Sequence, residues 1–247
     1  MIRIKDYEEL KVRIVNWLKD YYWKYDIKAF VVGVSGGIDS AVVSTLCAET
    51  GFPTYVLTMP LHSKKGNTEL SDAHAKALSK KYSNVRVVNI DLSNTYESLL
   101  FDIDQDFVNN KLANANTKSR LRMVSLYQVA GSVGGIVVGT GNKVEDYGIG
   151  FYTKYGDGGV DIAPIADLYK TEVWELGEFL GVDERICDAP PTDGLWDDGR
   201  NDEDQIGATY VQLEEAMENK TGVALNILEE YNKKNKHKME PIPTFKL

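Results

Sequence analysis

The segment Ser35-Gly36-Gly37-Ile38-Asp39-Ser40 combines two glycines, two hydroxyls and a carboxylate within six residues. It follows an apolar run, residues 29–34, and opens a segment with helical spacing. Glycines let backbone N–H groups converge on a phosphate, and the helix adds the positive end of its dipole. Such a turn can also simply cap a helix. The complete hexamer between strand and helix favours phosphate binding.

Asp39 is the unusual member of this loop. A carboxylate beside a bound phosphate repels it unless a divalent cation lies between them, so the loop implies a Mg²⁺ site. The Gly-Lys-Ser/Thr of the Walker loop is absent, as is the GxGxxG motif of dinucleotide-binding dehydrogenases. The sequence therefore predicts a phosphate site of a different kind.

The elements around the loop alternate between short apolar runs and helical patterns. This alternation predicts an α/β fold with a mainly parallel sheet, doubly wound, with helices on both faces. Strands are expected at residues 29–34, 55–59, 85–90 and 135–139, and helices at 40–50, 69–82, through most of 97–131, at 171–180 and twice within 206–235. Because no repeat, linker or composition break interrupts the chain, we expect one domain over residues 1–247.

Residues 141–161 follow the last predicted strand and are rich in glycine and charged side chains. We expect them to form a long loop over the carboxyl edge of the sheet, because they are too polar for a core element. Loops at that edge commonly bind ligands. A second irregular stretch is expected between Pro190 and Asp204.

Composition limits the class of protein further. Of 247 residues, 43% are hydrophobic and 26% charged, and 28 basic against 37 acidic side chains give a formal net charge of −9. That charge argues against nucleic acid or an anionic membrane as a partner. No apolar stretch is long enough to span a membrane. Only Cys47 and Cys187 occur, as expected for reduced thiols, so we predict a soluble cytoplasmic protein.

The hexamer at residues 35–40 resembles the pyrophosphate loop of the N-type ATP pyrophosphatases, which have a Rossmann-like fold of the adenine nucleotide alpha hydrolase type. The segment Thr153-Lys-Tyr-Gly-Asp-Gly-Gly-Val-Asp161 resembles the corresponding segment of NAD synthetases within that group. Further similarity lies at residues 118–123, 170, 191–193, 202–203 and 237–238. One departure is Gly139-Thr-Gly-Asn-Lys-Val-Glu145, where the family usually has Gly-Thr-Asp-His-Ala-Ala-Glu.

The resemblance implies a ligase that forms a C–N bond. It would amidate deamido-NAD to NAD with ammonia, through an adenylated intermediate, and release AMP and pyrophosphate from ATP. The residues before Ser35 are too few for a glutamine amidase domain, so free ammonia is the expected nitrogen source. The family also implies a homodimer. Two alternatives remain open: a GMP synthetase-like or other N-type ATP pyrophosphatase, and a module that binds adenine nucleotides without chemistry.

The resemblance also implies the site residues. Mg²⁺ would be held by Asp39 and Glu145, although Glu145 can also be read as a solvated loop acid. Lys170 would neutralise charge on the phosphates of ATP. Asp157 would attract ammonium and accept its proton, unless it serves only as a turn residue. The ATP contacts are Gly33, Val34, Ser35, Gly36, Gly37, Ile38, Asp39, Ser40, Thr140, Lys170 and Thr192, and the deamido-NAD contacts are Arg120, Lys154, Asp161, His237 and Lys238.

Overall fold

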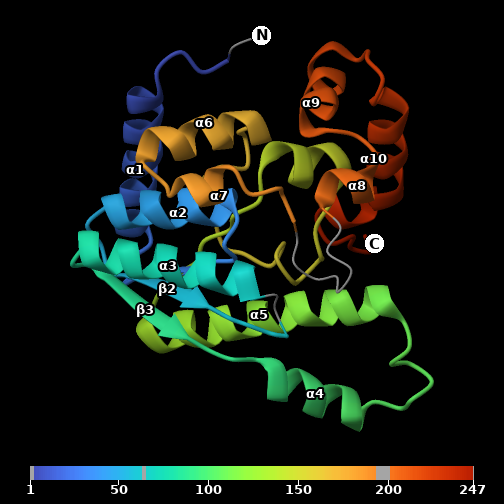
Figure 1. Ribbon diagram of the computed structural model, residues 1–247, viewed down its shortest axis with the longest axis horizontal. Helices are drawn as coiled ribbons and strands as arrows, with labels where there is room; N and C mark the ends of the chain where they lie inside the picture. Colours follow the sequence, from blue (N-terminus) through green and yellow to red (C-terminus); the bar gives the residue numbers. More distant parts are fainter. Residues whose placement is uncertain (1–2, 63–64, 193–200, 247) are drawn as a thin grey trace.

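Four parallel strands form one sheet in the order β3-β2-β1-β4 in the computed structural model, which describes residues 3–62, 65–192 and 201–246 (Figure 1). The strands are β1 (Phe30–Gly33), β2 (Thr54–Thr58), β3 (Val85–Asn89) and β4 (Ile136–Val137). The first three confirm the predicted runs. The fourth is shorter than the predicted 135–139, and beyond it Val138 forms a single parallel bridge with Ile162.

Helices make up most of the remaining described chain. They are α1 (Tyr7–Lys24), α2 (Ile38–Glu49), α3 (Lys65–Lys81), α4 (Ser93–Asp102), α5 (Lys111–Val133), the short π-helix η1 (Val144–Ile149), α6 (Lys170–Leu180), α7 (Glu184–Cys187), α8 (Asp202–Ile206), α9 (Tyr210–Asn219) and α10 (Leu225–Met239). The segment 97–131, predicted to be mostly helical, is divided between α4 and α5. None of these described helices has the length and apolar character needed to cross a membrane.

Both faces of the sheet are covered, as the prediction of a doubly wound fold requires (Figure 1). Side chains alternate between the two faces of a strand, and β1 shows this directly. Phe30 and Val32 belong to the core shared with α1, α2 and α6, whereas Val31 belongs to the core shared with α4 and α5. All three side chains are fully buried, so the run 29–34 is apolar because β1 lies between two layers.

A third core lies beside the sheet and corrects the expectation of a long loop at 141–161. Val144 and Ile149 of η1 are fully buried and pack with α8, α9 and α10. Figure 1 shows these C-terminal helices grouped at one end of the molecule. The prediction failed because the helices that bury η1, α8, α9 and α10, lie more than fifty residues later in the chain. Within the segment 141–161, residues 141–142 and 150–161 are free of helix and regular strand.

Helix α6 lies very close to α2 because of Gly177. A Cβ atom at this position would be 2.4 Å from Cδ1 of Ile38 and 3.4 Å from Cγ2 of Val42. A larger residue would force the side chain of Ile38 to shift or the two helices to separate. The close packing sets the first residue of α6, Lys170, near the first turn of α2.

Candidate active site

The phosphate loop joins β1 to α2 as predicted. Gly36 has a φ of 91°, a conformation that favours glycine, and Gly37 is the N-cap residue of α2. Ser40 Oγ donates to the carbonyl of Gly37 at 2.9 Å and accepts from the N–H of Ser35 at 3.2 Å. Because Gly37 provides no side-chain cap, the first amides of α2 remain oriented towards the adjacent cavity, as an anion site requires.

Lys170 lies between two carboxylates from different elements. Its Nζ is 2.5 Å from Oδ2 of Asp39, on α2, and 3.1 Å from Oε1 of Glu145, on η1. The lysine is only 3% exposed. The three residues that the sequence assigned to metal binding and charge neutralisation therefore form one cluster, in which Lys170 is buried and the two carboxylates are partly buried. Glu145 is not a solvated loop acid.

The cluster has a defined electrostatic balance. Burial alone would lower the pKa of Lys170, but the charges of Asp39 and Glu145 more than offset it, so that the pKa is raised and the ammonium stays charged. The neighbouring Asp146 behaves differently. Burial, reinforced by Glu145 and Asp157, raises the pKa of Asp146 to about 7. A third acid thus lines the cavity beside the cluster.

Two further residues hold this cluster in place, and neither was identified from the sequence. Asn142 donates to Oδ1 of Asp39 at 3.1 Å, and its own Oδ1 accepts from the N–H groups of Val144 and Glu145. Tyr210 is fully buried, and its hydroxyl donates to Oε1 of Glu145 at 2.7 Å. Its ring lies 4.9 Å from Nζ of Lys170.

The sequence signals for these two residues differ. Asn is a common residue at the start of a helix, so the sequence could have predicted that Asn142 accepts hydrogen bonds from the first N–H groups of η1. Tyr210 begins α9, sixty-five residues after Glu145, and no local pattern reports such a contact.

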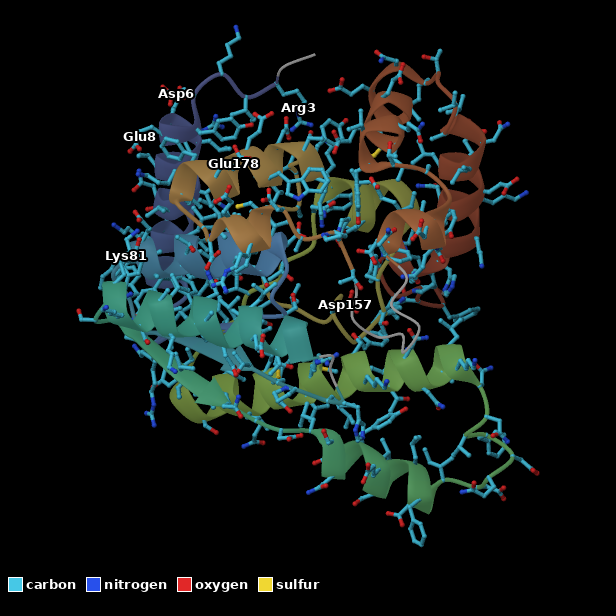
Figure 2. All side chains as sticks on the ribbon, in the orientation of Figure 1. Arg3, Asp6, Glu8, Lys81, Asp157 and Glu178 are labelled. Atoms are coloured by element: carbon cyan, nitrogen blue, oxygen red, sulfur yellow. The ribbon has the colours of Figure 1, made fainter. Side chains whose placement is uncertain are left out.

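The glycine-rich turn at residues 153–159 is anchored to α5. Asp157 Oδ1 accepts from Oγ of Ser119 at 2.7 Å and from the N–H of Thr153 at 3.0 Å. Figure 2 shows Asp157 over α5, near the middle of the molecule. Its carboxylate closes the turn and also borders the cavity, so the two interpretations of Asp157 are compatible.

Cations from α5, the glycine-rich turn and α10 line the same cavity as the phosphate loop. Lys238 Nζ donates to the carbonyl of Tyr152 at 2.6 Å, and the hydroxyl of Tyr152 donates to the carbonyl of Lys238 at 2.7 Å. Arg120 Nε donates to the carbonyl of Lys154 at 3.3 Å. The basic segment that ends with His237 and Lys238 belongs to α10 and packs on the turn.

One cavity of about 1050 Å³ connects these groups. Every predicted site residue lines it except one. The exception is Asp161, whose carboxylate accepts from the hydroxyl of Tyr127 at 3.0 Å and from the N–H of Val137 at 2.7 Å, at the edge of the sheet. The structure does not bring Asp161 into the cavity, and its assignment to the substrate stays a prediction.

The residues present fit a magnesium ion. Carboxylate oxygens are the ligands that Mg²⁺ prefers, and two carboxylates from separate elements already surround one cation here. Within the described residues, no group of three or more His, Cys, Asp or Glu side chains forms a complete cage. That agrees with Mg²⁺ sites in which one or two carboxylates act together with the phosphates of the substrate.

Comparison with known proteins decides the family. The family described as NAD synthase matches residues 10–242. The chain belongs to this family. A relative described as NH(3)-dependent NAD(+) synthetase, from Carboxydothermus hydrogenoformans, is 38% identical over 239 residues, covering 94% of this chain and 95% of the relative. Another of the same description, from Methanosarcina mazei, is 34% identical and covers 96% and 98%.

Solved structures of the NAD synthase family and its neighbours share the fold. The NMN synthetase from Francisella tularensis has a TM-score of 0.91 and 33% identity, covering 99% of this chain and all of that one. The NH3-dependent NAD synthetase from Campylobacter jejuni, solved with a nitrate ion, has a TM-score of 0.78 at 23% identity and supports the fold alone. The predicted α/β fold is confirmed, and the chain is a ligase of the NAD synthetase type.

Proposed function

We propose that this chain converts deamido-NAD to NAD with ATP and ammonia, through an adenylated intermediate, and releases AMP and pyrophosphate. One observation carries the proposal. One and the same cavity is lined by the phosphate loop and Lys170 and by the glycine-rich turn with its cations. ATP and an anionic second substrate can therefore meet within it. We propose further that the protein acts as a homodimer.

Each side of the cavity has its own task. The amides of residues 35–40 bind the pyrophosphate portion of ATP, and Lys170 offsets the negative charge that builds up as the adenylate forms. Arg120, Lys154 and Lys238 hold the phosphates of the second substrate. Asp157 attracts ammonium and receives its proton as the amide bond forms.

Asp39 and Glu145 would hold magnesium in this proposal. The ion, when bound, shields the attacking carboxylate from the negative phosphates of ATP. The chain itself keeps the two carboxylates oriented for that task through Asn142 and Tyr210. Their contacts with Asp39 and Glu145 are made by groups that carry no charge, so they leave the total charge of the site unchanged.

A second candidate substrate follows from the likeness to the Francisella tularensis NMN synthetase, whose TM-score of 0.91 exceeds the 0.78 of the Campylobacter jejuni NAD synthetase. Formation of NMN by amidation would start from nicotinate mononucleotide. The reacting carboxylate is the same as in deamido-NAD, and only the adenylate portion is missing. The two substrates therefore need the same reactive site and differ in how much of the remaining surface they occupy.

A substrate comparison tests both candidates. The protein is incubated with MgATP, ammonium and one of three acids: deamido-NAD, nicotinate mononucleotide or xanthylate. We expect amide formation and pyrophosphate release with deamido-NAD. Faster turnover of the mononucleotide would instead establish the second candidate. Turnover of xanthylate alone would indicate a GMP synthetase-like enzyme, and ATP binding without turnover would indicate a nucleotide-binding module.

Asp39→Asn tests the phosphate-loop assignment. We expect the rate of adenylation to fall by about 100-fold or more, because the carboxylate that faces both the metal and Lys170 is lost. The fold should persist, since Lys170 keeps its contact with Glu145. The control is Asp167→Asn, which removes an exposed carboxylate paired with Lys143. Adenylation at a normal rate in Asp39→Asn would exclude the proposed metal role.

A further inference from the structure

The ammonium of Lys170 lies at the place where the proposed magnesium ligands converge. It contacts Oδ2 of Asp39 and Oε1 of Glu145, and it lies over the ring of Tyr210. Oε1 of Glu145 is also the acceptor for the hydroxyl of Tyr210. Oδ2 of Asp39 and Oε1 of Glu145, two of the oxygens available to a divalent ion, are thus already in contact with groups of the chain itself.

The charges explain why these contacts form. Two partly buried carboxylates that lie close together repel each other and need a counter-cation, which Lys170 supplies. A divalent ion on the same oxygens would also offset the negative charge of the two carboxylates, with two positive charges in place of the single charge of Lys170. It would also place a double positive charge beside the ammonium, in surroundings that screen poorly. The two cations therefore compete for one pair of carboxylates.

Lys170 has a path out of the cluster. It is the first residue of α6, its side chain is long and flexible, and it lines the same cavity as residues 35–40 of the phosphate loop. An ammonium that leaves Asp39 and Glu145 moves into the space where the phosphates of ATP would bind. Close packing at Gly177 keeps the backbone of α6 fixed, so that only the side chain needs to move.

We propose that Lys170 is an internal counter-cation that exchanges with the divalent ion: it occupies Asp39 and Glu145 in the metal-free protein and moves towards the ATP phosphates when the ion binds. This inference rests on the magnesium site of the proposed function and adds a second task to Lys170. In this exchange, binding of the metal is coupled to the movement of Lys170 towards the phosphates. A consequence is that Lys170 weakens metal binding in the absence of ATP.

Direct binding of Mn²⁺ to the nucleotide-free protein tests this exchange. In Lys170→Met the ion no longer displaces an ammonium, so we expect Mn²⁺, followed by electron paramagnetic resonance, to bind about tenfold tighter than in the wild type. The matched control is Lys143→Met. Lys143 also pairs with a carboxylate, Asp167, and lies over the ring of Tyr169, but it does not line the cavity. Its replacement should leave Mn²⁺ affinity unchanged.

Thermal unfolding gives a second readout. Metal-free Lys170→Met should unfold at a lower temperature than the wild type. Addition of Mn²⁺ should raise the unfolding temperature of the variant by more than it raises that of the wild type. Equal or weaker Mn²⁺ binding by a folded Lys170→Met would overturn the proposal.

A measurement on the wild type covers the case in which the variant does not fold. In protein labelled with ¹⁵N at lysine Nζ, the signal of the buried Lys170 ammonium should shift on saturation with Mg²⁺ and not with Na⁺. An unchanged signal at saturation would also overturn the proposal. Neither experiment uses turnover or a nicotinate substrate, so a wrong assignment of the reaction would appear separately, as absence of amide formation in the wild type.

Discussion

Asp157 illustrates how one carboxylate serves both the fold and the proposed reaction. Its N–H donates to Oγ of Ser119 at 2.9 Å while its Oδ1 accepts from the same hydroxyl, so that the turn is fixed to α5 by a reciprocal pair of hydrogen bonds. A side chain held in this way changes little on ligand binding. It presents a fixed negative charge to a small cation such as ammonium.

Asp157→Asn separates these two tasks. Asn keeps an oxygen that accepts the two hydrogen bonds, so the turn should persist, but it has neither the charge nor the proton affinity of the carboxylate. We expect attack of ammonia on preformed adenylate to slow by about 100-fold in single-turnover experiments, while adenylation stays near normal. Attack at the wild-type rate would remove Asp157 from this role.

Tyr210 is the residue on which the orientation of Glu145 depends most directly. Tyr210→Phe removes one buried hydrogen bond to a carboxylate, and we expect the free energy of unfolding to fall by about 1.5–3 kcal/mol. The Mg²⁺ concentration needed for half-maximal activity should also rise severalfold.

Tyr82→Phe provides the matched control for Tyr210→Phe. The hydroxyl of Tyr82 donates to Oε1 of Glu49 at 2.6 Å, away from the cavity. This variant should lose stability without a change in the Mg²⁺ requirement. If both variants changed the Mg²⁺ requirement equally, the effect would be a general one and Tyr210 would have no special part in the site.

At the level of elements, the sequence predicts those helices and strands whose formation depends on residues close together in the chain. The strands β1 and β2 were recognisable because each is a short run of mostly buried apolar side chains, next to a turn or a helix pattern. Strand β3 lies at the edge of the sheet and is mostly exposed, and its β-branched valines indicated it instead. The π-helix η1 was not, because Glu145 and Asp146 face the cavity and only Val144 and Ile149 report burial. Helix α10 was expected, but its anchoring on Tyr152 depends on a contact across eighty-six residues.

The packing of α3 on α2 contains a pH-dependent contact. Nε2 of His74 and Oγ of Ser44 are 2.9 Å apart, and both side chains are buried. Burial lowers the pKa of His74 to about 4, from an ordinary value of 6.5, against smaller opposing effects of a hydrogen bond with the backbone of Ala41 and of the charge of Asp183. As the pH falls, the unfolded chain is therefore protonated at this histidine before the folded one. The stability that neutral His74 provides is complete above about pH 6.5 and is lost as the pH approaches 4.

Urea unfolding of the wild type and His74→Gln at pH 7.5 and pH 5 measures this contribution. Gln retains a hydrogen-bonding group near Ser44 but does not titrate. We expect the free energy of unfolding of the wild type to fall by about 2 kcal/mol more than that of the variant over this range. Parallel losses in the two proteins would show that other groups account for the pH dependence.

For the whole molecule, the cavity lies where the sheet meets the C-terminal helices. All but one of the residues singled out from the sequence line this cavity, because glycine turns and charged side chains after a strand carry a local signature. Asp161 shows the limit of that approach. It belongs to the most specific motif of the chain, yet its carboxylate caps the N–H of Val137 beside β4. A motif identifies which residues lie together, whereas the direction of each side chain depends on the packing around it.

The exposed face of α5 bears on the proposed homodimer. Leu112 and Val124 are exposed on this helix, which also carries Arg120 at the border of the cavity. A dimer through α5 would bury these apolar groups and narrow the cavity entrance. Val124→Lys places a charge on that face, so we expect the mass measured by light scattering to change from that of a dimer to that of a monomer. The KM for deamido-NAD should rise, and ATP binding should stay unchanged.

Val211→Lys is the control for this change, since Val211 on α9 is 61% exposed and Val124 is 58% exposed. Because the two positions are similarly exposed, the intrinsic cost of the new lysine should be comparable in the two helices. A difference in mass between the two variants must therefore come from a neighbouring subunit on α5. If wild-type protein has the mass of a monomer at micromolar concentration, or if Val124→Lys remains a dimer, the interface does not involve this face of α5.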